Sequence, residues 1–220
     1  MPTSLITGAN RGIGLALCRE LSARGQRVIA ACRTTSPELE KLGVEVQSGV
    51  DVRTPATLDA LAQRLAGTPV DWLIANAGVL RYEGLDDLNI ETVKEQLEIN
   101  ALGTLLTVKA LRPNLKRGSK IGLVTSRMGS IGDNTSGGYY GYRMSKAALN
   151  AAGMSLAHDL RPSGIAVAIL HPGYVRTDMT AGSGQVESSE SARMLIERMT
   201  ALSLDTTGTF WHANGQQLPW

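Results

Sequence analysis

The sequence predicts an α/β fold in which a seven-stranded, mainly parallel sheet is doubly wound, with helices on both of its faces. Short apolar runs of strand length alternate with helical patterns along the whole chain. The first six runs are apolar throughout, which is typical of strands that are covered on both faces in a parallel sheet. No linker, repeat or low-complexity stretch divides residues 1–220. We therefore expect a single domain.

The elements follow one another with short links. The segments predicted as strands are Ser4–Thr7, Val28–Ala31, Val44–Val50, Trp72–Ala75, Ile121–Thr125, Ile165–Leu170 and Thr209–His212. The segments predicted as helices are Gly12–Arg24, Pro37–Leu42, Pro55–Ala66, Ile90–Leu111, Tyr142–Leu160 and Glu190–Leu202. Ser36 and Thr54 each precede a proline, a pairing that predicts a helix N-cap. The irregular stretches 130–141 and 180–189 follow strand ends, where active-site loops are expected.

Composition and charge exclude several classes of protein. The chain has 220 residues, 43% hydrophobic and 19% charged, with a net charge of +2, which rules out a disordered or collagen-like chain. Without a dense run of Lys or Arg, we expect no nucleic-acid or membrane partner. No segment reaches the roughly 18 apolar residues of a membrane span and no leader precedes the first strand. Cys18 and Cys32 cannot form a framework of disulfides. These features predict a cytoplasmic protein, and the three scattered histidines predict no metal site.

A glycine-rich turn lies between the first strand and the first helix. Residues 7–14 read TGANRGIG. With 24 glycines in the chain the spacing alone is weak, and its place in the first strand-to-helix turn gives it meaning. Gly8 permits a tight turn, while Gly12 and Gly14 let the backbone approach a pyrophosphate at the helix N-terminus. The pattern favours a Rossmann dinucleotide site over tight packing without a ligand.

The end of the second strand bears on the choice of dinucleotide. It reads Ala31-Cys32-Arg33, without the carboxylate that commonly holds a ribose 2′-hydroxyl. Arg33 and Arg11 can together hold a 2′-phosphate, so NADPH is preferred over NADH, although Arg33 alone could be a solvated loop residue. Asp51 follows the third strand and is placed to bond an adenine amine. A plain turn carboxylate is the alternative reading of Asp51.

Tyr142 and Lys146 are spaced four residues apart near the start of one predicted helix, and therefore share a face. They follow the fifth strand, at the same sheet edge as the glycine turn. A phenol has a pKa of about 10, and a neighbouring ammonium favours its ionised form. We expect Lys146, with a positive nicotinamide ring, to lower the pKa of Tyr142 toward neutrality for acid–base catalysis. The lysine could also hold ribose hydroxyls.

These residues resemble the short-chain dehydrogenases/reductases, and the resemblance covers essentially the whole chain. The motifs that carry it are TGANRGIG at 7–14, Asn76-Ala77-Gly78, Asn100, Ser126, Tyr142 to Lys146, and His171 to Thr177. The stretch from Gly129 to Asn150 and the ending Pro219-Trp220 look most like the Sniffer/C-factor-like carbonyl reductase branch.

The resemblance implies a role for each matching residue. Tyr142 would be the general acid in carbonyl reduction, and Ser126 would orient the substrate oxygen. Lys146 would lower the Tyr142 pKa, and Asn100 would kink its helix and hold a water in a proton relay. The residues implied to bind the cofactor are Gly8, Asn10, Arg11, Gly12, Ile13, Gly14, Arg33, Asp51, Val52, Asn76, Ala77, Gly78, Tyr142, Lys146, Pro172, Gly173, Val175 and Thr177. The substrate would be a small carbonyl compound or alcohol.

Some features depart from the family pattern. Ser126 precedes Tyr142 by 16 residues rather than the usual 13, so Ser130 competes with it. We prefer Ser126 because Gly129 follows it at the family's offset and because a strand end holds a side chain firmly. The lid after Thr177 is short, which predicts an open and mobile site. His171, His158 and His212 are expected to be structural.

Two further expectations concern assembly and function class. The helix from Tyr142 carries the small residues Ala147, Ala148, Ala151, Ala152 and Gly153. Related proteins pair this helix and the one from Ile90 across a two-fold axis, which implies a homodimer or homotetramer. The rival to an NADPH-dependent reductase is a dinucleotide-binding signalling or sensing protein of the C-factor type without essential turnover. The set of Asn100, Ser126, Tyr142 and Lys146 favours the enzyme.

Overall fold

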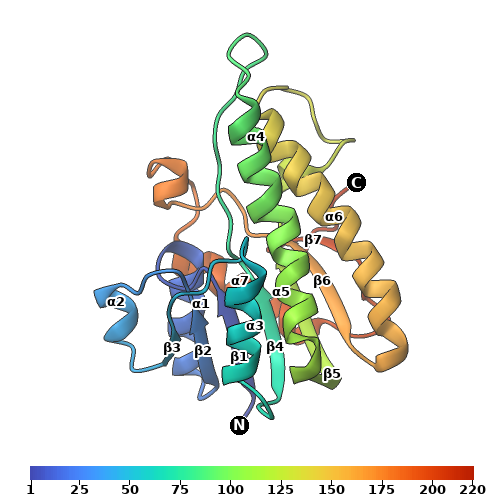
Figure 1. Ribbon diagram of the computed structural model, residues 1–220. Coiled ribbons are helices and arrows are strands. Elements are labelled where there is room, and N and C mark those ends of the chain that lie inside the picture. The colour runs from blue at the N-terminus through green and yellow to red at the C-terminus, as the bar shows by residue number, and fades with distance from the viewer.

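The computed structural model describes residues 1–220 and contains one seven-stranded sheet (Figure 1). The strands stand in the order β3-β2-β1-β4-β5-β6-β7, and every neighbouring pair is parallel. Their bounds are β1 Thr3–Thr7, β2 Arg27–Ala31, β3 Glu45–Gln47, β4 Val70–Ala75, β5 Leu115–Val124, β6 Ala166–His171 and β7 Phe210–His212. The order reverses direction between β1 and β4, which is where doubly wound sheets bind ligands. The predicted fold class is confirmed.

Helices cover both faces of this sheet. The α-helices are α1 Gly12–Ala23, α2 Pro37–Glu40, α3 Pro55–Arg64, α4 Ile90–Leu97, α5 Gly103–Leu111, α6 Tyr140–Leu160 and α7 Ser188–Ala201. Buried residues of α3, α5 and α6 share one core cluster, and buried residues of α1, α2 and α7 share the other. Figure 1 shows α4 and α5 end to end as one rod, with α6 beside it in front of the sheet.

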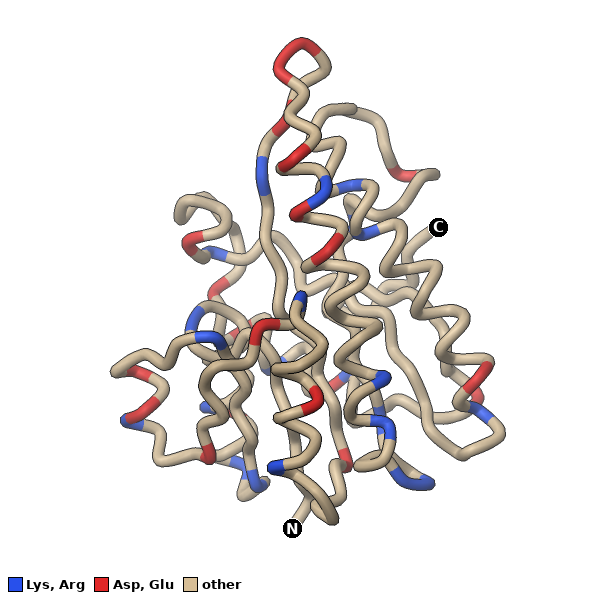
Figure 2. Tube along the Cα trace, in the orientation of Figure 1, with Lys and Arg blue, Asp and Glu red and all other residues tan.

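Charged residues of both signs recur along the whole chain (Figure 2). Their ion pairs join side chains that are at least partly exposed, such as Arg27 on β2 with Glu45 on the edge strand β3, at 2.6 Å. Pairs of this kind add little to stability. None of the helices combines the length and apolarity needed to cross a membrane.

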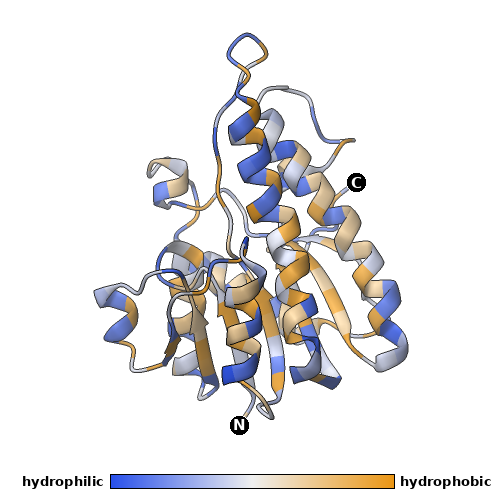
Figure 3. Ribbon diagram, viewed as in Figure 1, coloured by the Kyte–Doolittle hydropathy of each residue, from blue (hydrophilic) through white to orange (hydrophobic).

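The apolar strands supply side chains to two cores, one on each face. In β4, Leu73 belongs to one cluster and its neighbour Ile74 to the other. In β6, Ile169 and Leu170 divide in the same way. Successive strand residues point to opposite faces, so a sheet covered on both sides needs an apolar residue at every position. Figure 3 shows the strands as the most hydrophobic part of the fold.

Two strands differ in length from the prediction by more than two residues. β3 ends at Gln47, because residues 48–49 turn away at the exposed edge of the sheet, where Gly49 has a φ of +74°. β5 begins at Leu115 rather than Ile121, since Leu115 pairs with Val70 before a break in register. The polar residues between these points gave no apolar run by which the strand could be recognised.

The predicted helix over 90–111 forms without a break, but its geometry changes from α-helical to π-helical and back. A π-helical turn, η1 (Glu98–Leu102), separates α4 from α5 and contains Asn100. Single π turns inside an α-helix are rare and are frequently found at functional sites. The expected distortion at Asn100 is therefore present as a π turn.

Both predicted N-cap residues precede their helices, and one of them makes the capping bond. Ser36, the N-cap of α2, accepts a hydrogen bond from the Leu39 N–H at 3.2 Å. Thr54 is the N-cap of α3, but its side chain makes no capping bond, so the expected role of its hydroxyl was wrong. The Thr57 hydroxyl instead joins the loop to the helix start by donating to the Asp51 and Thr54 carbonyl oxygens, at 2.7 and 2.9 Å.

The outer face of α6 carries part of the predicted row of small residues. Ala148 and Ala151 are exposed, together with Met144. Gly153 points inward, where a Cβ would lie 2.8 Å from Ile169. Its small size therefore serves packing of the helix onto the sheet, which corrects its assignment to the outer row.

Candidate active site

The glycine turn after β1 is closed to side chains. Gly8 has a φ of +65°, in the left-handed region that favours glycine, and a Cβ on it would lie 2.8 Å from the Ala77 Cα. A Cβ on Gly14 would overlap the Gly8 carbonyl oxygen. The backbone is thus left bare at the N-terminus of α1, as close approach of a pyrophosphate requires.

Hydrogen bonds lock the glycine turn to the loop after β4. The Thr7 hydroxyl accepts from the backbone N–H groups of Asn76 and Ala77, at 3.1 and 3.2 Å. The Asn76 side-chain amide donates to the carbonyl oxygens of Thr7 and Gly8, at 3.1 and 3.2 Å. The two loops on either side of the strand-order reversal therefore form one unit.

A first cleft of about 490 Å³ lies over this unit, within the range of cofactor and small-ligand sites. The predicted cofactor residues that line it are Gly8, Asn10, Arg11, Gly12, Ile13, Arg33, Asp51, Val52, Asn76, Ala77, Gly78 and Thr177. Gly14 lies beneath the turn and lines no part of it. The predicted residues that line the cleft therefore come from each of the loops that follow β1, β2, β3 and β4.

The charged groups at this cleft differ in whether they form ion pairs. Arg11 lies 3.4 Å from the Asp178 carboxylate, and both side chains are largely exposed. Arg53 donates to Asp51 and lowers the pKa of that carboxyl, and the charge of Arg33 acts on Asp51 in the same direction. Arg33 lines the cleft, is exposed and forms no ion pair.

A second cleft of about 340 Å³ adjoins the first. Ile13, Thr177 and Met179 line both clefts, so the two are continuous. Ser126, at the end of β5, and Tyr142, in the first turn of α6, line the second cleft together. The remaining predicted residues that line it are Pro172, Gly173, Val175 and Thr177.

The structure distinguishes Ser126 from Ser130. Ser126 and Tyr142 line the second cleft together, and the nearby Ser126 hydroxyl acts to lower the pKa of the tyrosine. Ser130 is buried, lines neither cleft, and accepts from the Asp133 N–H at 3.1 Å. Its role is to close the loop after Met128, which leaves Ser126 as the hydroxyl next to Tyr142.

Tyr142 and Lys146 are both almost fully buried. The Lys146 Nζ lies 5.7 Å from the centre of the Tyr142 ring and donates to the Val124 carbonyl oxygen at 3.0 Å. Burial lowers the pKa of Lys146 to about 8. Burial raises the pKa of Tyr142 to about 12, outweighing the opposite influence of the Ser126 hydroxyl. The expected downward shift of the tyrosine is therefore reversed among the protein's own groups, because desolvation of the phenolate dominates.

Asn100 sits in the π turn directly behind these groups. Its Oδ1 accepts from the Val79 N–H at 2.8 Å, and its Nδ2 donates to the Val79 carbonyl oxygen and to the Ser145 hydroxyl, each at 2.9 Å. A Cβ on Gly78 would lie 3.1 Å from the Asn100 Oδ1 and 3.6 Å from the Lys146 Nζ. Asn100, the loop after β4 and Lys146 are thus brought together.

His171 belongs to the second cleft, whereas the sequence favoured a structural role for it. It lines the cleft with Ser126 and Tyr142, and its ring meets His212 edge to face, with 4.8 Å between ring centres. Burial lowers the pKa of His171 to about 3, so the imidazole is neutral at physiological pH. Its position next to Pro172, at the end of β6, is the signal that could have found it.

The family model for short chain dehydrogenase matches residues 2–188. A 1-hydroxy-2-glutathionyl-2-methyl-3-butene dehydrogenase of Rhodococcus sp. strain AD45 is 42% identical over 226 residues, covering 100% of both chains. The C-signal protein of Myxococcus xanthus is 41% identical over 164 residues, covering 73% of this chain and 99% of its own.

Solved structures give the same picture. The carbonyl reductase Sniffer of D. melanogaster superimposes with a TM-score of 0.94 at 30% identity, covering 100% of both chains. An NADPH-bound carbonyl reductase from chicken fatty liver superimposes with a TM-score of 0.91 at 29% identity, covering 100% of this chain and 99% of its own.

Proposed function

The chain belongs to the short-chain dehydrogenase family, and from this premise we propose that it is an NADPH-dependent oxidoreductase that reversibly reduces the carbonyl group of an aldehyde or ketone to an alcohol. The observation that carries the proposal is the pair of hydroxyls, Ser126 and Tyr142, in a cleft continuous with the glycine cleft. An alcohol or carbonyl carbon in the second cleft would lie beside a cofactor in the first.

The glycine cleft supports a dinucleotide because its backbone is bare where a pyrophosphate would lie. Such a cofactor supplies the hydride. Arg33 would hold the 2′-phosphate, since it lacks an acidic partner and no carboxylate stands at the end of β2. The NADPH bound to the chicken carbonyl reductase agrees with this preference.

Tyr142 would donate a proton to the carbonyl oxygen. Burial keeps the phenol protonated at neutral pH in the free protein, and the charges of Lys146 and of a bound nicotinamide would bring its pKa nearer the operating pH, where a general acid works best. Ser126, which lines the same cleft, would orient the substrate oxygen. Lys146 and Asn100 would support the tyrosine from behind, the lysine by the positive charge that it mostly retains near pH 7.

The substrate class follows from the lining of the second cleft and from the relatives. Leu80, Met128 and Met179 line it beside Arg127 and Arg143, so an apolar compound with a polar or anionic end would fit. The Rhodococcus relative is named for an alcohol that carries a glutathionyl group. Thioether alcohols of that kind therefore belong in the substrate panel with simple aldehydes and ketones.

The proposal includes a homodimer or homotetramer built on the outer faces of α6 and of the α4–α5 rod. Leu102 and Leu105 are 55% and 40% exposed, and Met144 on α6 is 51% exposed, more apolar surface than one solvated helix pair needs. Light scattering at micromolar concentration should give a multiple of the 23.4 kDa chain mass. A monomer alone would contradict this part of the proposal.

The test of the activity is NADPH oxidation by the purified protein with the carbonyl panel, and NADP⁺ reduction with the alcohols. We expect turnover with at least one compound and a preference for NADPH over NADH. Tight binding of NADPH with no turnover on any compound would contradict the proposal.

That negative result would favour the second candidate, a dinucleotide-binding signalling or sensing protein. The similarity to the C-signal protein supports it. A protein that only binds has no need of both Ser126 and Tyr142 in the lining of one cleft, and their presence there favours the enzyme.

A further inference from the structure

We propose that Glu83, which lines neither cleft, is a positioning residue that fixes the first turn of α6 and so holds the Tyr142 hydroxyl in the second cleft beside Ser126. This inference rests on the proposed function, because it concerns the residue assigned there as the acid. Glu83 is 1% exposed although it carries a carboxylate, and no Lys or Arg forms an ion pair with it. A buried carboxylate without a cation must be stabilised by hydrogen bonds.

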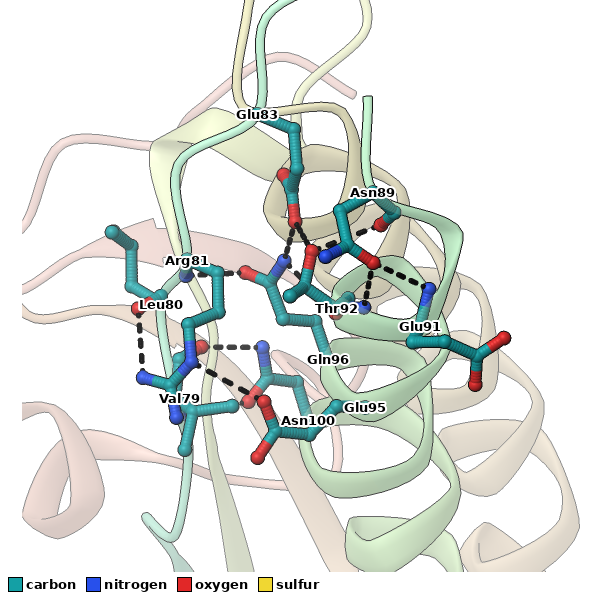
Figure 4. Close-up of polar contacts among 10 residues, drawn as sticks. All are labelled: Val79, Leu80, Arg81, Glu83, Asn89, Glu91, Thr92, Glu95, Gln96 and Asn100. Carbon is teal, nitrogen blue, oxygen red and sulfur yellow. Dashed lines mark hydrogen bonds and ion pairs between the residues drawn. The ribbon is translucent and has the colours of Figure 1, made fainter. Parts of the chain in front are cut away.

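Glu83 ends a ladder of side-chain contacts between the loop after β4 and the α4–η1 helix (Figure 4). Asn100 bonds the backbone of Val79, and the Gln96 Oε1 accepts from the Arg81 N–H at 2.8 Å. The Thr92 hydroxyl donates to the Glu83 carboxylate, also at 2.8 Å.

The spacing of this ladder has a geometric basis. The loop residues Val79, Arg81 and Glu83 are two positions apart. They bond Asn100, Gln96 and Thr92 respectively, which are four positions apart on the helix. Two residues of extended chain span about 6.6 Å and four helical residues about 6 Å, so the two rows stay in step over three contacts. The loop is thereby held to the helix from the π turn up to Glu83.

Glu83, the last residue of this ladder, also forms a hydrogen bond with the first turn of α6. The Glu83 Oε2 accepts from the Gly141 N–H at 3.2 Å, and its Oε1 accepts from the Gln96 Nε2 at 2.5 Å. A Cβ on Gly141 would lie 2.5 Å from that Gln96 nitrogen and 2.9 Å from the Val93 Cα. A carboxylate is favoured at a helix N-terminus, and here it bonds the residue directly before Tyr142.

The residue that precedes α6 is strained and held by the same segment. Tyr139 has a φ of +54°, which a non-glycine residue adopts only where its surroundings enforce it. Its N–H donates to the Glu83 carbonyl oxygen at 2.9 Å, and its ring meets Tyr82 edge to face at 4.9 Å. Glu83 therefore fixes the first turn through its backbone and through its side chain.

The test compares E83A and E83Q with wild type. E83A removes every carboxylate contact, while E83Q keeps the size of the side chain and loses one acceptor. Misplacement of a reacting group by about 1 Å can cost roughly 100-fold in rate. We expect kcat to fall about 10- to 100-fold in E83A and less in E83Q, with the Kd for NADPH unchanged, and amide exchange at Gly141 to become faster in both.

The matched control is E95A. Glu95 pairs with Arg81 at 3.2 Å and so links the same loop to α4 without touching α6. Its kcat should stay within about twofold of wild type. In a Y142F background, E83A should cause no further loss, because a residue that acts through Tyr142 has nothing left to position.

The outcomes separate this inference from the proposed function. If wild type turns over carbonyl compounds and E83A and E83Q keep full kcat, or lose NADPH binding in proportion to kcat, the positioning role is overturned. If wild type shows no turnover, the proposed function fails, and amide exchange decides the positioning. Faster exchange at Gly141 in E83Q would then support it, and unchanged exchange would overturn it.

Discussion

The two clefts meet at Thr177 but are built differently. In the first, the shape comes from the backbone: Gly8 and Gly14 leave no room for a side chain, and Thr7 and Asn76 tie two neighbouring loops together. In the second, the working atoms are side-chain hydroxyls. Their places depend on contacts between segments that are distant in the sequence, such as Glu83 with Gly141. We therefore expect a substitution to impair the first cleft when an added side chain overlaps the backbone. We expect a substitution to impair the second cleft when it removes or displaces a single side-chain hydroxyl.

The largest effect should come from removing the acid of the second cleft. Tyr142→Phe deletes the hydroxyl that lies in the second cleft with Ser126 while keeping the buried ring. General acid catalysis contributes about 10²- to 10⁴-fold, so kcat should fall by about a thousandfold at unchanged affinity for NADPH. Steady-state kinetics and a fluorescence titration measure the two quantities. Unchanged turnover would remove Tyr142 from the assignment.

The first cleft is probed by Gly14→Ala. The new methyl group would overlap the Gly8 carbonyl oxygen, which cannot move because Asn76 holds it. Overpacking of this kind costs about 1–3 kcal/mol or more, so we expect denaturant melts to show that loss in unfolding free energy, together with weakened NADPH binding.

Gly25→Ala is the control for that change. Gly25 has a φ of +74°, with nothing within 4 Å of a new Cβ. The substitution should cost only the strain of a left-handed alanine, about 1–2 kcal/mol, and should leave NADPH binding intact. If both variants lost NADPH binding equally, binding at the glycine turn would not depend on the close packing of Gly14.

Dinucleotide choice is the next effect in size. Arg33→Ala removes the cation proposed to hold the 2′-phosphate, and hydrogen bonds to charged groups are worth about 1.5–3 kcal/mol. The Kd for NADPH should rise about 10- to 100-fold, with the Kd for NADH unchanged. Arg24, exposed and outside both clefts, provides the matched control R24A. If R33A weakened the binding of NADPH and of NADH equally, Arg33 would have a role in packing and not in recognition of the 2′-phosphate.

The same contrast governs what could be predicted from sequence. The alternation of apolar runs and helices predicted the fold class, and local patterns located the glycine turn and the Tyr142–Lys146 pair. Glu83 belongs to no local pattern, and its carboxylate becomes meaningful only when the loop after β4 meets α6. The lowered pKa of Tyr142 was predicted with the nicotinamide bound, and burial raises it among the protein's own groups, because sequence spacing reveals the neighbouring cation but not the burial.

The smallest predicted effect concerns the pH dependence of stability at Lys146. Burial lowers its folded-state pKa to about 8, whereas an unfolded lysine titrates near 10.4. Below pH 8 both states hold the proton and the cost of burying the ammonium is present in full. Between pH 8 and 9 the folded state releases its proton first, so this residue should add about 1 kcal/mol to the unfolding free energy.

Lys146→Met isolates that contribution. Burial raises the pKa of Cys18 and Cys32, so above about pH 8 the unfolded thiols ionise first and the cysteines act in the opposite sense. Both proteins share those cysteines, so the difference between wild type and K146M in urea melts at pH 8 and pH 9 reports the lysine alone. We expect wild type to gain about 1 kcal/mol relative to the variant. A difference that does not change with pH would mean that Lys146 is solvated in the folded protein, and a charge so screened could not support the phenolate form of Tyr142.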